Sequence, residues 1–510
     1  MLGDGYFGHT FLKVGFLYEC MVLKLYNSLT NALEEFIPVL EGKVRMYNCG
    51  PTVYSYQHIG NFRSFMFADL LRRVFKYKGY EITQVMNITD VGHLTDDGDD
   101  GEDKLDVAAK KEKKHPLEIA QFYTDAFLAD WKTLRLEEIE FRPKATEMIA
   151  EIIMLIEQLL EKKHAYISEG NVYYDITSFP DYGKLSGNTL DKLTKNRVEK
   201  DPNKKNPQDF VLWFGNSKFE NHILEWDSPW GKGYPGWHAE CSVMSAKFLT
   251  DAFASGKLSA KHFETIDIHT GGEDNRFPHH ECEIAQSEGA FGKKYVNYWL
   301  HPKHLQVEGG KMSKSKGNVY YVFDLIKEGF SWRAIRYLLL SSHYRQTLNF
   351  TKEGLTAATQ AISRIDDTLK KLNTLRTEHE YSEQLAKAMN EMKLAIQQEL
   401  DNDLNTSGAF GALFEGIKHI NKSLDEGIVG EDQAKEILNT IMGLDDVFGF
   451  LPAEILDDEK ISSDIADLLS ERAAAREEKD WAKSDALRDQ LKIKGYDVRD
   501  APTGQELRKR

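Results

Sequence analysis

Cysteine is scarce in this chain, with four residues among 510. So few cysteines exclude a disulfide scaffold and indicate reduced thiols. No apolar run reaches the roughly 20 residues that a membrane-spanning helix needs. The most apolar stretch near the start, residues 11–25, is interrupted by Lys13, Glu19 and Lys24 and leads to no small-residue cleavage site. We therefore expect a cytoplasmic protein without a signal peptide or membrane anchor.

Basic residues are outnumbered by acidic ones, which leaves a formal net charge of −16. A negative net charge argues against a polyanionic partner, although a basic stripe on an acidic body is compatible with one. Apolar residues make up 41% and charged residues 29% of the chain, as in ordinary soluble globular proteins. Composition therefore leaves both an enzyme and a binding protein open.

The N-terminal part of the chain predicts an α/β domain. Residues 1–20 show no clear period and are interpreted as an extension, since Met21 offers an alternative start. The sequence predicts a βαβ unit with a parallel sheet, made of a strand over 43–50, an amphipathic helix over 62–79 and a strand over 81–89. Ligands bind at the carboxyl ends of such strands, so we expect chemistry in the turn after the first strand.

The rest of the chain divides into an insertion, a helical half and a small C-terminal unit. The insertion predicts helices over 115–134 and 143–163 and strands over 171–176 and 209–214, and sheet character resumes at 264–270. The helical half is predicted from the patterns over 332–344, 352–376, 381–402, 406–423 and 431–447. Two further helices are expected within 461–492, and a strand over 494–499. The predicted units are the extension 1–20, the α/β halves 21–99 and 236–330, the insertion 100–235, the helical bundle 331–450 and the C-terminal unit 451–510.

Three residues mark the turn between the first strand and its helix: His58, Gly60 and Asn61. The first turn of a helix presents free backbone N–H groups and the positive end of the dipole, which favour phosphate. A glycine there allows a ligand to approach the backbone closely. An ordinary helix-capping turn is the alternative interpretation.

A polar loop with the sequence KMSKSKGN carries two lysines at interval three, Lys311 and Lys314. Such a loop can close over a triphosphate and neutralise the charge that develops on the leaving pyrophosphate. A solvated basic loop without a ligand is the alternative interpretation.

Four scattered residues offer soft and borderline metal donors: Cys49, Cys241, His279 and Glu283. His279 and Glu283 are four residues apart, so they share one face of a helix. Two thiolates, an imidazole and a carboxylate suit tetrahedral zinc. Buried core cysteines and histidines are the alternative, because ligands so distant in sequence are a weak signal.

Taken jointly, the motifs resemble class I aminoacyl-tRNA synthetases of the cysteinyl branch. The paired class signatures are HIGN from His58 and KMSKS from Lys311. The branch is indicated by NCGPTVY from Asn48, NITD from Asn87, GWHAEC from Gly236 and GGEDNRFPHHECEIAQ from Gly271. The resemblance covers nearly the whole chain from about Met21. It implies a Rossmann-like catalytic domain with an insertion, then a helical bundle and a small C-terminal anticodon-binding domain.

The resemblance implies one zinc ion per chain, held by Cys49, Cys241, His279 and Glu283. Cysteine differs from serine by sulfur in place of oxygen, so a pocket that senses only size and polarity separates them poorly. A thiolate binds zinc far better than an alcohol does, and the metal lowers the thiol pKa. The implied zinc therefore selects the substrate thiolate rather than activating water.

The resemblance also implies roles in ATP and amino-acid binding. The amino-acid pocket would include Gly50, Thr89 and Trp237. ATP, with its Mg²⁺, would contact His58, Gly60, Asn61, Asp274 and Lys314, and the transition state would be stabilised by His58, Asn61, Lys311 and Lys314. The cysteine carboxylate attacks the α-phosphorus, so positioning and charge neutralisation supply the catalysis.

The C-terminal unit resembles the anticodon-reading segment of that family at four residues: Arg476, Trp481, Asp485 and Asp500. An exposed tryptophan can stack on an unpaired base, while arginine and aspartate read base edges. A capped amphipathic helix is the alternative interpretation. The implied partners are tRNA(Cys), ATP and L-cysteine, and the family leads us to expect a monomer.

The sequence departs from the family pattern at several positions. Asn61 stands where class I enzymes often have a second histidine, and Asn275 and Arg276 replace apolar residues. Cys282 lies beside Glu283, about 100° away on a helix, where a swap of metal ligands is conceivable. The tail also lacks a tryptophan that is often found near the end.

Two other kinds of protein share parts of this pattern. A ligase that joins cysteine to an amino sugar has the same zinc site and ATP motifs but generally lacks the anticodon-binding end. A non-enzymatic tRNA-binding protein derived from a synthetase usually loses the lysine loop or a zinc ligand, and this sequence retains both.

Overall fold

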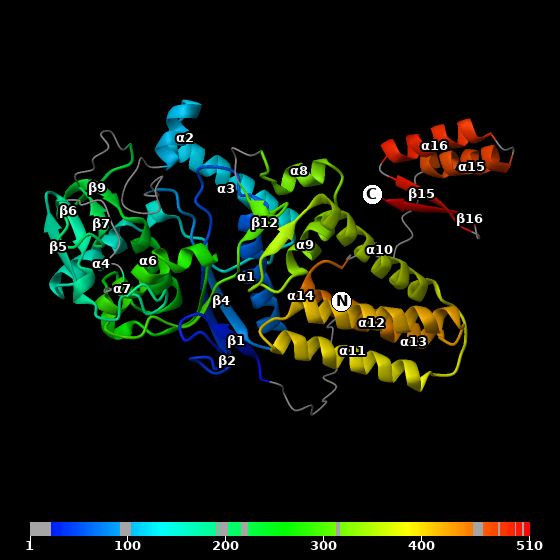
Figure 1. Ribbon diagram of the computed structural model, residues 1–510, viewed down its shortest axis with the longest axis horizontal. Coiled ribbons are helices and arrows are strands. Elements are labelled where there is room, and N and C mark those ends of the chain that lie inside the picture. Colours follow the sequence, from blue (N-terminus) through cyan, green and yellow to red (C-terminus); the bar gives the residue numbers. More distant parts are fainter. Residues whose placement is uncertain are drawn as a thin grey trace, which may run out of the picture.

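The computed structural model describes residues 22–91, 104–189, 192, 202–215, 223–312, 317–451, 463–477, 480–494, 496–501 and 504–509. The predicted extension and Lys314 lie outside these residues. Figure 1 shows an elongated molecule, with the insertion at one end, the α/β part in the middle and the long helices at the other end. No helix in the described ranges is long and apolar enough to cross a bilayer.

The central sheet is parallel, as predicted, and has the strand order β11-β10-β3-β4. Its strands are β3 (Lys43–Asn48), β4 (Glu81–Met86), β10 (Ile266–Thr270) and β11 (Val296–Leu300). Helix α1 (Ile59–Tyr77) connects β3 to β4 and completes the expected βαβ unit. The insertion separates β4 from β10, so two distant parts of the sequence complete one sheet.

The insertion contains a five-stranded antiparallel sheet of order β5-β6-β7-β9-β8 that was only partly predicted. Its strands are β5 (Ala165–Ser168), β6 (Asn171–Tyr174), β7 (Phe210–Phe214), β8 (Trp226–Ser228) and β9 (Gly231–Pro235). The prediction recognised β6 and β7 and missed the others, because strands of three to five residues carry little periodicity. Its helices are α2 (Lys104–Glu112), which was missed, α3 (Pro116–Thr133) and α4 (Ile149–Glu161), which begins later than predicted.

An N-terminal hairpin, β1 (Lys24–Asn27) with β2 (Ala32–Glu35), was also missed. It contacts the helical bundle through Asp403, whose backbone N–H donates to the Lys24 carbonyl at 2.9 Å. The Asp403 carboxylate accepts from the backbone N–H of Tyr26 at 2.8 Å and from the hydroxyl of Tyr344 at 2.6 Å. One buried aspartate thus holds the N-terminal hairpin against the bundle.

The helical half agrees with the prediction except at Val322–Lys327, where a helix was missed, and near residue 444. Its helices are α8 (Val322–Lys327), α9 (Trp332–Leu340), α10 (Lys352–Thr374), α11 (Glu383–Asp401), α12 (Thr406–Asp425), α13 (Glu431–Gly443) and α14 (Asp445–Phe448). The single helix predicted over 431–447 was wrong, since the chain breaks it after Gly443. Between the sheet and this half lies a small sheet of β12 (Leu305–Val307), β13 (Gly310–Lys311) and β14 (Leu348–Phe350).

The C-terminal unit is a helix pair over a hairpin. It comprises α15 (Ser463–Glu477), α16 (Trp481–Ile493), β15 (Tyr496–Ala501) and β16 (Gly504–Lys509). Both helices and β15 agree with the prediction, whereas β16 was missed. Ile465, Leu491 and Val498 form a small core of their own. This unit therefore has the organisation of a separate small domain.

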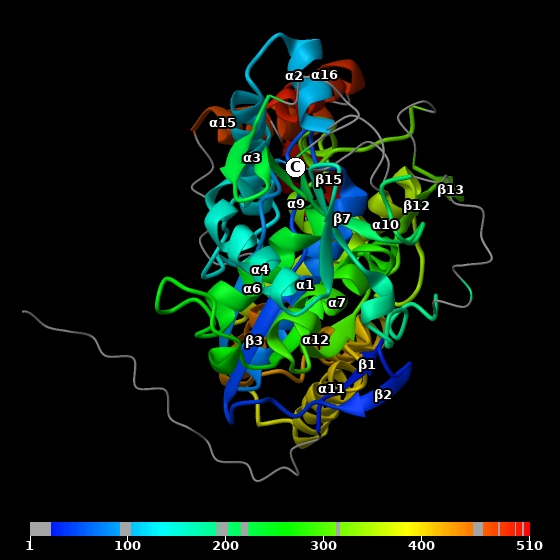
Figure 2. The ribbon, with the colours of Figure 1, turned by 90° about the vertical axis from the view of Figure 1, so that its left-hand side faces the viewer.

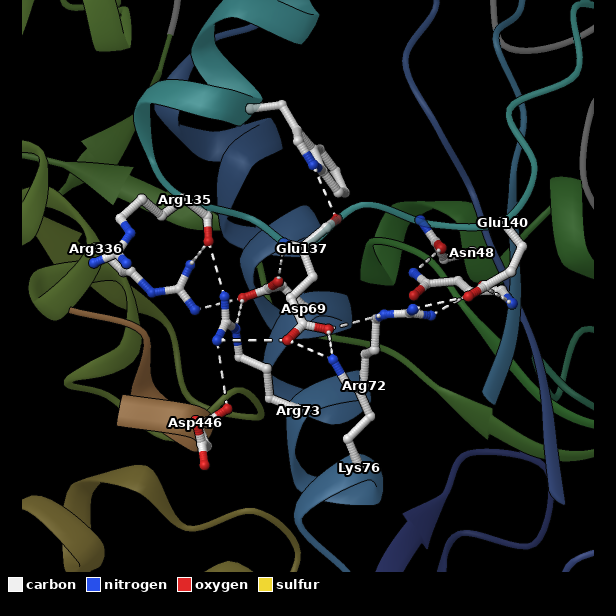
Figure 3. A network of polar contacts seen from close by, with 12 residues as sticks. Asn48, Asp69, Arg72, Arg73, Lys76, Arg135, Glu137, Glu140, Arg336 and Asp446 are labelled. Atoms are coloured by element: carbon white, nitrogen blue, oxygen red, sulfur yellow. Dashed lines mark hydrogen bonds and ion pairs between the residues drawn. The ribbon is translucent and has the colours of Figure 1, made fainter. Parts of the chain in front are cut away.

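A buried ion network ties α1 to the insertion and the helical half (Figure 3). Asp69 of α1 accepts from Arg73 Nε at 2.8 Å and pairs with Arg336 of α9. Arg336 also donates to the carbonyl oxygens of Phe448 at 2.7 Å and Leu134 at 3.1 Å. Although burial opposes ionisation, Arg336 and Arg73 hold the pKa of the Asp69 carboxyl below its usual range. Three parts of the molecule meet at this one carboxylate.

Replacing Arg336 by Met is expected to lower the free energy of unfolding by about 3–5 kcal/mol, because the substitution removes half of a buried charge pair. Urea denaturation followed by circular dichroism measures the change. The matched control is Lys418→Met, since the Lys418–Glu415 pair at 3.0 Å is exposed and should contribute little to stability because solvent screens it. Equal losses in the two variants would show that the buried network does not hold these parts together.

Candidate metal centre and active site

The candidate site lies at the carboxyl ends of the central strands, where α/β sheets bind ligands. Cys49 follows β3 directly, and its backbone N–H donates to the carbonyl of Thr270, the last residue of β10, at 2.9 Å. Two helices complete the site: α6 (Trp237–Leu249) carries Cys241, and α7 (His279–Phe291) carries His279 and Glu283. The predicted turn after the first strand is therefore part of the site.

The four predicted metal donors converge. The ligand atoms of Cys49, Cys241, His279 and Glu283 all lie within 4.8 Å of one another. The Cys241 Sγ is 3.4 Å from His279 Nε2, which is 3.1 Å from Glu283 Oε1. Cys241, His279 and Glu283 are at most 1% exposed, so the cluster is closed to bulk water on that side. Two sulfurs, one imidazole nitrogen and one carboxylate oxygen form a donor set that suits zinc.

The orientation of Glu283 supports a cation at this place. Its Oε2 accepts hydrogen bonds from His269 Nε2 at 2.9 Å and from the Tyr295 hydroxyl at 3.2 Å. Its Oε1 is buried and has no hydrogen-bond partner among the described residues. An unsatisfied buried carboxylate oxygen is costly, and a metal ion beside His279 and Cys241 would satisfy it. The residues present therefore fit zinc.

His279 is oriented by two neighbours on α6. Its Nδ1 is 2.8 Å from His238 Nδ1, and its ring stacks on Trp237 with centroids 4.0 Å apart. Because its Nδ1 and one face of its ring are engaged in this way, His279 points its Nε2 at the thiol of Cys241. Partners that fix the ring of a metal-binding histidine are typical of such centres.

The surroundings of both thiols disfavour the thiolate. Burial raises the pKa of Cys49, and the charge of Glu283 raises it further. Burial raises the pKa of Cys241 well above its usual range, with Cys49 and Glu283 adding to the effect. A divalent metal reverses this balance, because a coordinating thiol loses its proton.

Three further histidines surround the cluster, and none was singled out in the sequence. His269, His280, Cys49 and Glu283 form a second, overlapping group of donors. His280 Nε2 is 3.2 Å from Cys49 Sγ, and His280 Nδ1 is 2.8 Å from His301 Nε2. Burial, followed by the neighbouring histidines, holds the pKa of His280 well below its usual range. His280 thus contacts Cys49 as a neutral imidazole, and His269 positions Glu283 through its hydrogen bond. The sequence offered little sign of these three histidines. Only His269 carried a weak signal, as a histidine near the end of a predicted strand.

The structure brings the two class signatures together. The backbone N–H of Ile59 donates to the Tyr320 carbonyl at 3.0 Å, which joins the start of α1 to the segment after the lysine loop. A Cβ at Gly60 would lie 3.1 Å from the His58 ring and 3.4 Å from the Met312 methyl group, so Met312 lies next to the start of α1. Lys311 ends β13.

His58 and Asn61 form a reciprocal cap on α1. The Asn61 backbone N–H donates to His58 Nδ1 at 3.1 Å, and the His58 backbone N–H donates to Asn61 Oδ1 at 3.1 Å. The capping interpretation is therefore correct for this arrangement. The cap uses Nδ1 of His58 and Oδ1 of Asn61 as acceptors, so a donor atom of either side chain can contact a phosphate while the cap stays in place.

The other predicted pocket residues also border the metal cluster. Gly50 is required by packing, since a side chain there would lie 1.8 Å from the Asn87 carbonyl oxygen. Thr89 is buried, and its hydroxyl donates to Glu240 Oε2 at 2.8 Å, beside Cys241. Trp237 stacks on His279, as described above. Asp274 lies in the turn Glu273–Arg276, and its charge raises the pKa of Cys49.

The departures at Cys282 and Arg276 have structural explanations. Cys282 Sγ lies 3.4 Å from the Tyr182 hydroxyl and belongs to neither donor group, so it is not placed as a metal ligand. Arg276 Nε donates to the Leu185 carbonyl at 2.8 Å, and Arg276 Nη2 donates to the Ser28 carbonyl at 3.0 Å. A charged residue in that position therefore ties the site to the insertion and to the N-terminal hairpin.

Two of the predicted anticodon residues, Arg476 and Trp481, lie together in the C-terminal unit. The guanidinium of Arg476 lies 5.5 Å from the centroid of the Trp481 ring, which is 56% exposed. Asp485 is one helical turn further along α16 and pairs with Arg488 at 3.2 Å. Asp500 lies in β15, opposite Gln505. An exposed ring with a guanidinium beside it has the geometry that stacking on a base requires.

Comparison with known proteins supports the sequence motifs. Residues 35–360 match the family described as tRNA synthetases class I (C) catalytic domain. The chain belongs to the class I cysteinyl-tRNA synthetases. Residues 395–452 match the DALR domain, and residues 458–508 match the cysteinyl-tRNA ligase anticodon binding domain. This family consists of ligases, so the chain is an enzyme of that class.

Curated relatives align over almost their whole length. The cysteine–tRNA ligase of Treponema denticola is 43% identical over 495 residues, which cover 94% of this chain and 98% of that protein. The cysteine–tRNA ligase of Chlorobaculum tepidum is 42% identical, with the same coverage of both chains. The solved Mycobacterium tuberculosis methionyl-tRNA synthetase in complex with methionyl-adenylate has a TM-score of 0.59 at 13% identity, covering 84% of this chain and 94% of that one. The structural likeness confirms the class I synthetase fold.

Proposed function

We propose that the chain activates L-cysteine with ATP and transfers it to tRNA(Cys), using one zinc ion to select the substrate thiolate. The observation that carries the proposal is the buried convergence of Cys49, Cys241, His279 and Glu283 beside the class signatures. The membership of the cysteinyl-tRNA synthetase family supports the same reaction. All four donors come from one chain, so a monomer is sufficient, and a reducing cytoplasm would keep their thiols available.

The four donors would hold the zinc, which when bound supplies a soft Lewis acid that prefers a thiolate to an alcohol. The protein contributes the orientation of each donor. His269 and Tyr295 turn one oxygen of Glu283 toward the centre, and His238 with Trp237 orients His279. Discrimination against serine would then follow from ligand chemistry rather than from pocket size.

Formation of the adenylate needs no covalent nucleophile from the protein. The cysteine carboxylate attacks the α-phosphorus of ATP and displaces pyrophosphate. The start of α1, at His58, Gly60 and Asn61, offers the positive end of a helix dipole to the phosphates. Lys311 and Lys314 would neutralise the charge that develops on the leaving group, and Mg²⁺ would accompany ATP. Asp274 would bind ATP, while Gly50 and Thr89 would border the amino acid.

Charging and cysteine activation should respond differently to changes in the C-terminal unit. Trp481→Ala removes the exposed ring against which Arg476 lies, and we expect tRNA binding to weaken by roughly 1–3 kcal/mol. The comparison of charging with cysteine-dependent pyrophosphate exchange measures this, because exchange takes place without tRNA. Variants at Arg476, Asp485 and Asp500 should lose discrimination between anticodon bases.

The matched control is Ile493→Ala, since Ile493 is on the same helix and is 85% exposed. It should alter neither reaction. If Trp481→Ala abolished exchange as well, its role would be structural, and if it changed neither reaction, the anticodon assignment would be wrong.

The proposed function is tested by offering the enzyme two acceptors. With ATP and cysteine, the protein should load tRNA(Cys) and leave an amino sugar unmodified. An amino-sugar ligase remains the second candidate because it shares the zinc and ATP motifs, but the C-terminal helix pair with its exposed tryptophan favours tRNA. Ligation of cysteine to an amino sugar but not to tRNA would overturn the proposal.

A further inference from the structure

Four residues form a buried chain of hydrogen bonds between the two thiol donors of the metal cluster. The backbone N–H of Gly50 donates to Asn87 Oδ1 at 2.7 Å, and Asn87 Nδ2 donates to Thr89 Oγ1 at 2.8 Å. The Thr89 hydroxyl then donates to Glu240 Oε2 at 2.8 Å. The chain of hydrogen bonds thus begins directly after one thiol donor in the sequence and ends directly before the other.

The fold holds both ends of this chain of hydrogen bonds in place. Asn87 and Thr89 follow the carboxyl end of β4, and Glu240 is on α6, which packs beside β3 and α7 (Figure 2). The backbone of Thr89 is also fixed, since its N–H donates to the Pro51 carbonyl at 3.0 Å and its carbonyl accepts from the Val53 N–H at 3.1 Å. Asn87, Thr89 and Glu240 are at most 3% exposed. These side chains therefore belong to the dry floor of the site.

The direction of each hydrogen bond follows from the groups involved. A backbone N–H can only donate, so the atom of Asn87 that faces Gly50 is the amide oxygen. The amide nitrogen therefore faces Thr89 and donates to its oxygen, while an ionised carboxylate at Glu240 can only accept. A hydroxyl has one proton and two lone pairs. Thr89 has used its proton and one lone pair, so any further partner of its oxygen has to be a donor.

The remaining lone pair of Thr89 Oγ1 has no partner among the described residues. The α-ammonium of an amino acid offers only donors, and its carboxylate offers only acceptors. In cysteine, only Cα and Cβ separate the ammonium from the sulfur, so a cysteine bound through its sulfur at the donor cluster brings its ammonium near this chain of hydrogen bonds. An acceptor oxygen backed by the charge of Glu240 attracts the ammonium and repels the carboxylate, and the low dielectric of a buried site strengthens both effects.

We propose that Glu240 is a positioning residue for the amino acid: it takes the proton of the Thr89 hydroxyl and thereby keeps that oxygen available to the substrate ammonium. The substrate carboxylate is then left to face ATP, whose α-phosphorus it attacks. This inference rests on the proposed function, since it requires cysteine to be bound beside Thr89. A carboxylate that only fastened α6 to the strand ends would influence the binding of every thiol compound alike.

The test compares the binding of three thiols to the zinc-loaded full-length enzyme by calorimetry. They are cysteine, cysteamine, which lacks the carboxylate, and 3-mercaptopropionate, which lacks the ammonium. Glu240→Met keeps most of the side-chain volume and removes the acceptor, so it should weaken binding of cysteine and cysteamine by about tenfold and leave 3-mercaptopropionate at the parent affinity. In pyrophosphate exchange, the KM for cysteine should rise by the same factor with little change in kcat, because the lost contact is made equally in the ground state and the transition state.

A second variant, Thr89→Val, removes the hydroxyl itself and should show the same selective loss. The double variant with Glu240→Met should be no weaker than either single variant, because both substitutions remove the same contact. Thr89→Ser keeps the hydroxyl and should recover the affinity for cysteine that Thr89→Val loses. The matched control is Thr124→Val, since Thr124 is buried on α3 and its hydroxyl donates to the Ala120 carbonyl of the same helix at 2.7 Å. It should leave all three affinities at the parent level.

Two results would overturn the inference. Equal weakening of all three thiols in Glu240→Met and Thr89→Val, or loss of zinc from both variants, would show that these side chains only support the structure. Additive losses in the double variant would show two independent contacts instead of one. A parent enzyme that does not exchange pyrophosphate in the presence of cysteine would instead overturn the proposed function.

Discussion

Cys241→Ser is expected to lower bound zinc well below one ion per chain and to reduce cysteine-dependent pyrophosphate exchange by on the order of 100-fold or more. Changes in residues that only orient a ligand already cost about 10–100-fold, so loss of a thiolate ligand should cost at least as much. Cys241 Sγ lies 3.4 Å from His279 Nε2 within the buried donor group. Metal analysis of the purified protein and the exchange assay measure the two effects.

Cys282→Ser provides a closely matched control for this prediction. Cys282 is buried, lies on the same helix as His279 and Glu283, and receives the same substitution. Its sulfur contacts Tyr182 rather than the donor group, so zinc content and exchange should stay near those of the parent. Full zinc in Cys241→Ser, or zinc loss in Cys282→Ser alone, would show that the ligands are assigned wrongly.

Lys314→Ala is expected to slow formation of the adenylate by on the order of 100-fold or more, with little change in the affinity for cysteine. The proposed contact is made with charge that grows only in the transition state, so kcat and kcat/KM should fall together. Single-turnover and steady-state exchange kinetics measure these parameters. The structure supports the location, because the described residues on both sides of the loop lie next to the start of α1.

Lys327→Ala is the control for the loss of a lysine in this region, since Lys327 is exposed at the end of α8. It should leave exchange unchanged. A Lys314→Ala enzyme with a raised KM for cysteine and an unchanged kcat would contradict the assignment, because that pattern reports uniform binding.

The parallel sheet and most helices could be predicted because their signals are local. Helix α1 repeats its apolar residues at helical spacing, and the long helices after residue 350 do the same. The candidate metal donors were predicted as a set through family motifs, since spacing joins only His279 and Glu283, and Cys49 and Cys241 are brought together only by the fold. Sequence alone gives no distance between such residues.

The residues that were missed act through tertiary contacts. Nothing in the sequence distinguishes His269, His280 and His301 from other histidines. Their importance comes from contacts in the fold: His269 contacts Glu283, and His280 contacts both Cys49 and His301. The hairpin β1–β2 and the short strands of the insertion were missed because three to five residues show little alternation. The ion network around Asp69 was likewise invisible, since its charges come from three distant segments.

The central claim is that a protein-bound zinc ion selects the cysteine thiolate. The measurement that tests it most directly is pyrophosphate exchange with cysteine and with serine, before and after removal of the metal by a chelator. The account predicts exchange with cysteine only in the zinc-loaded enzyme, its loss on chelation and its return when zinc is added back. An unchanged preference for cysteine over serine in the metal-free enzyme would contradict it.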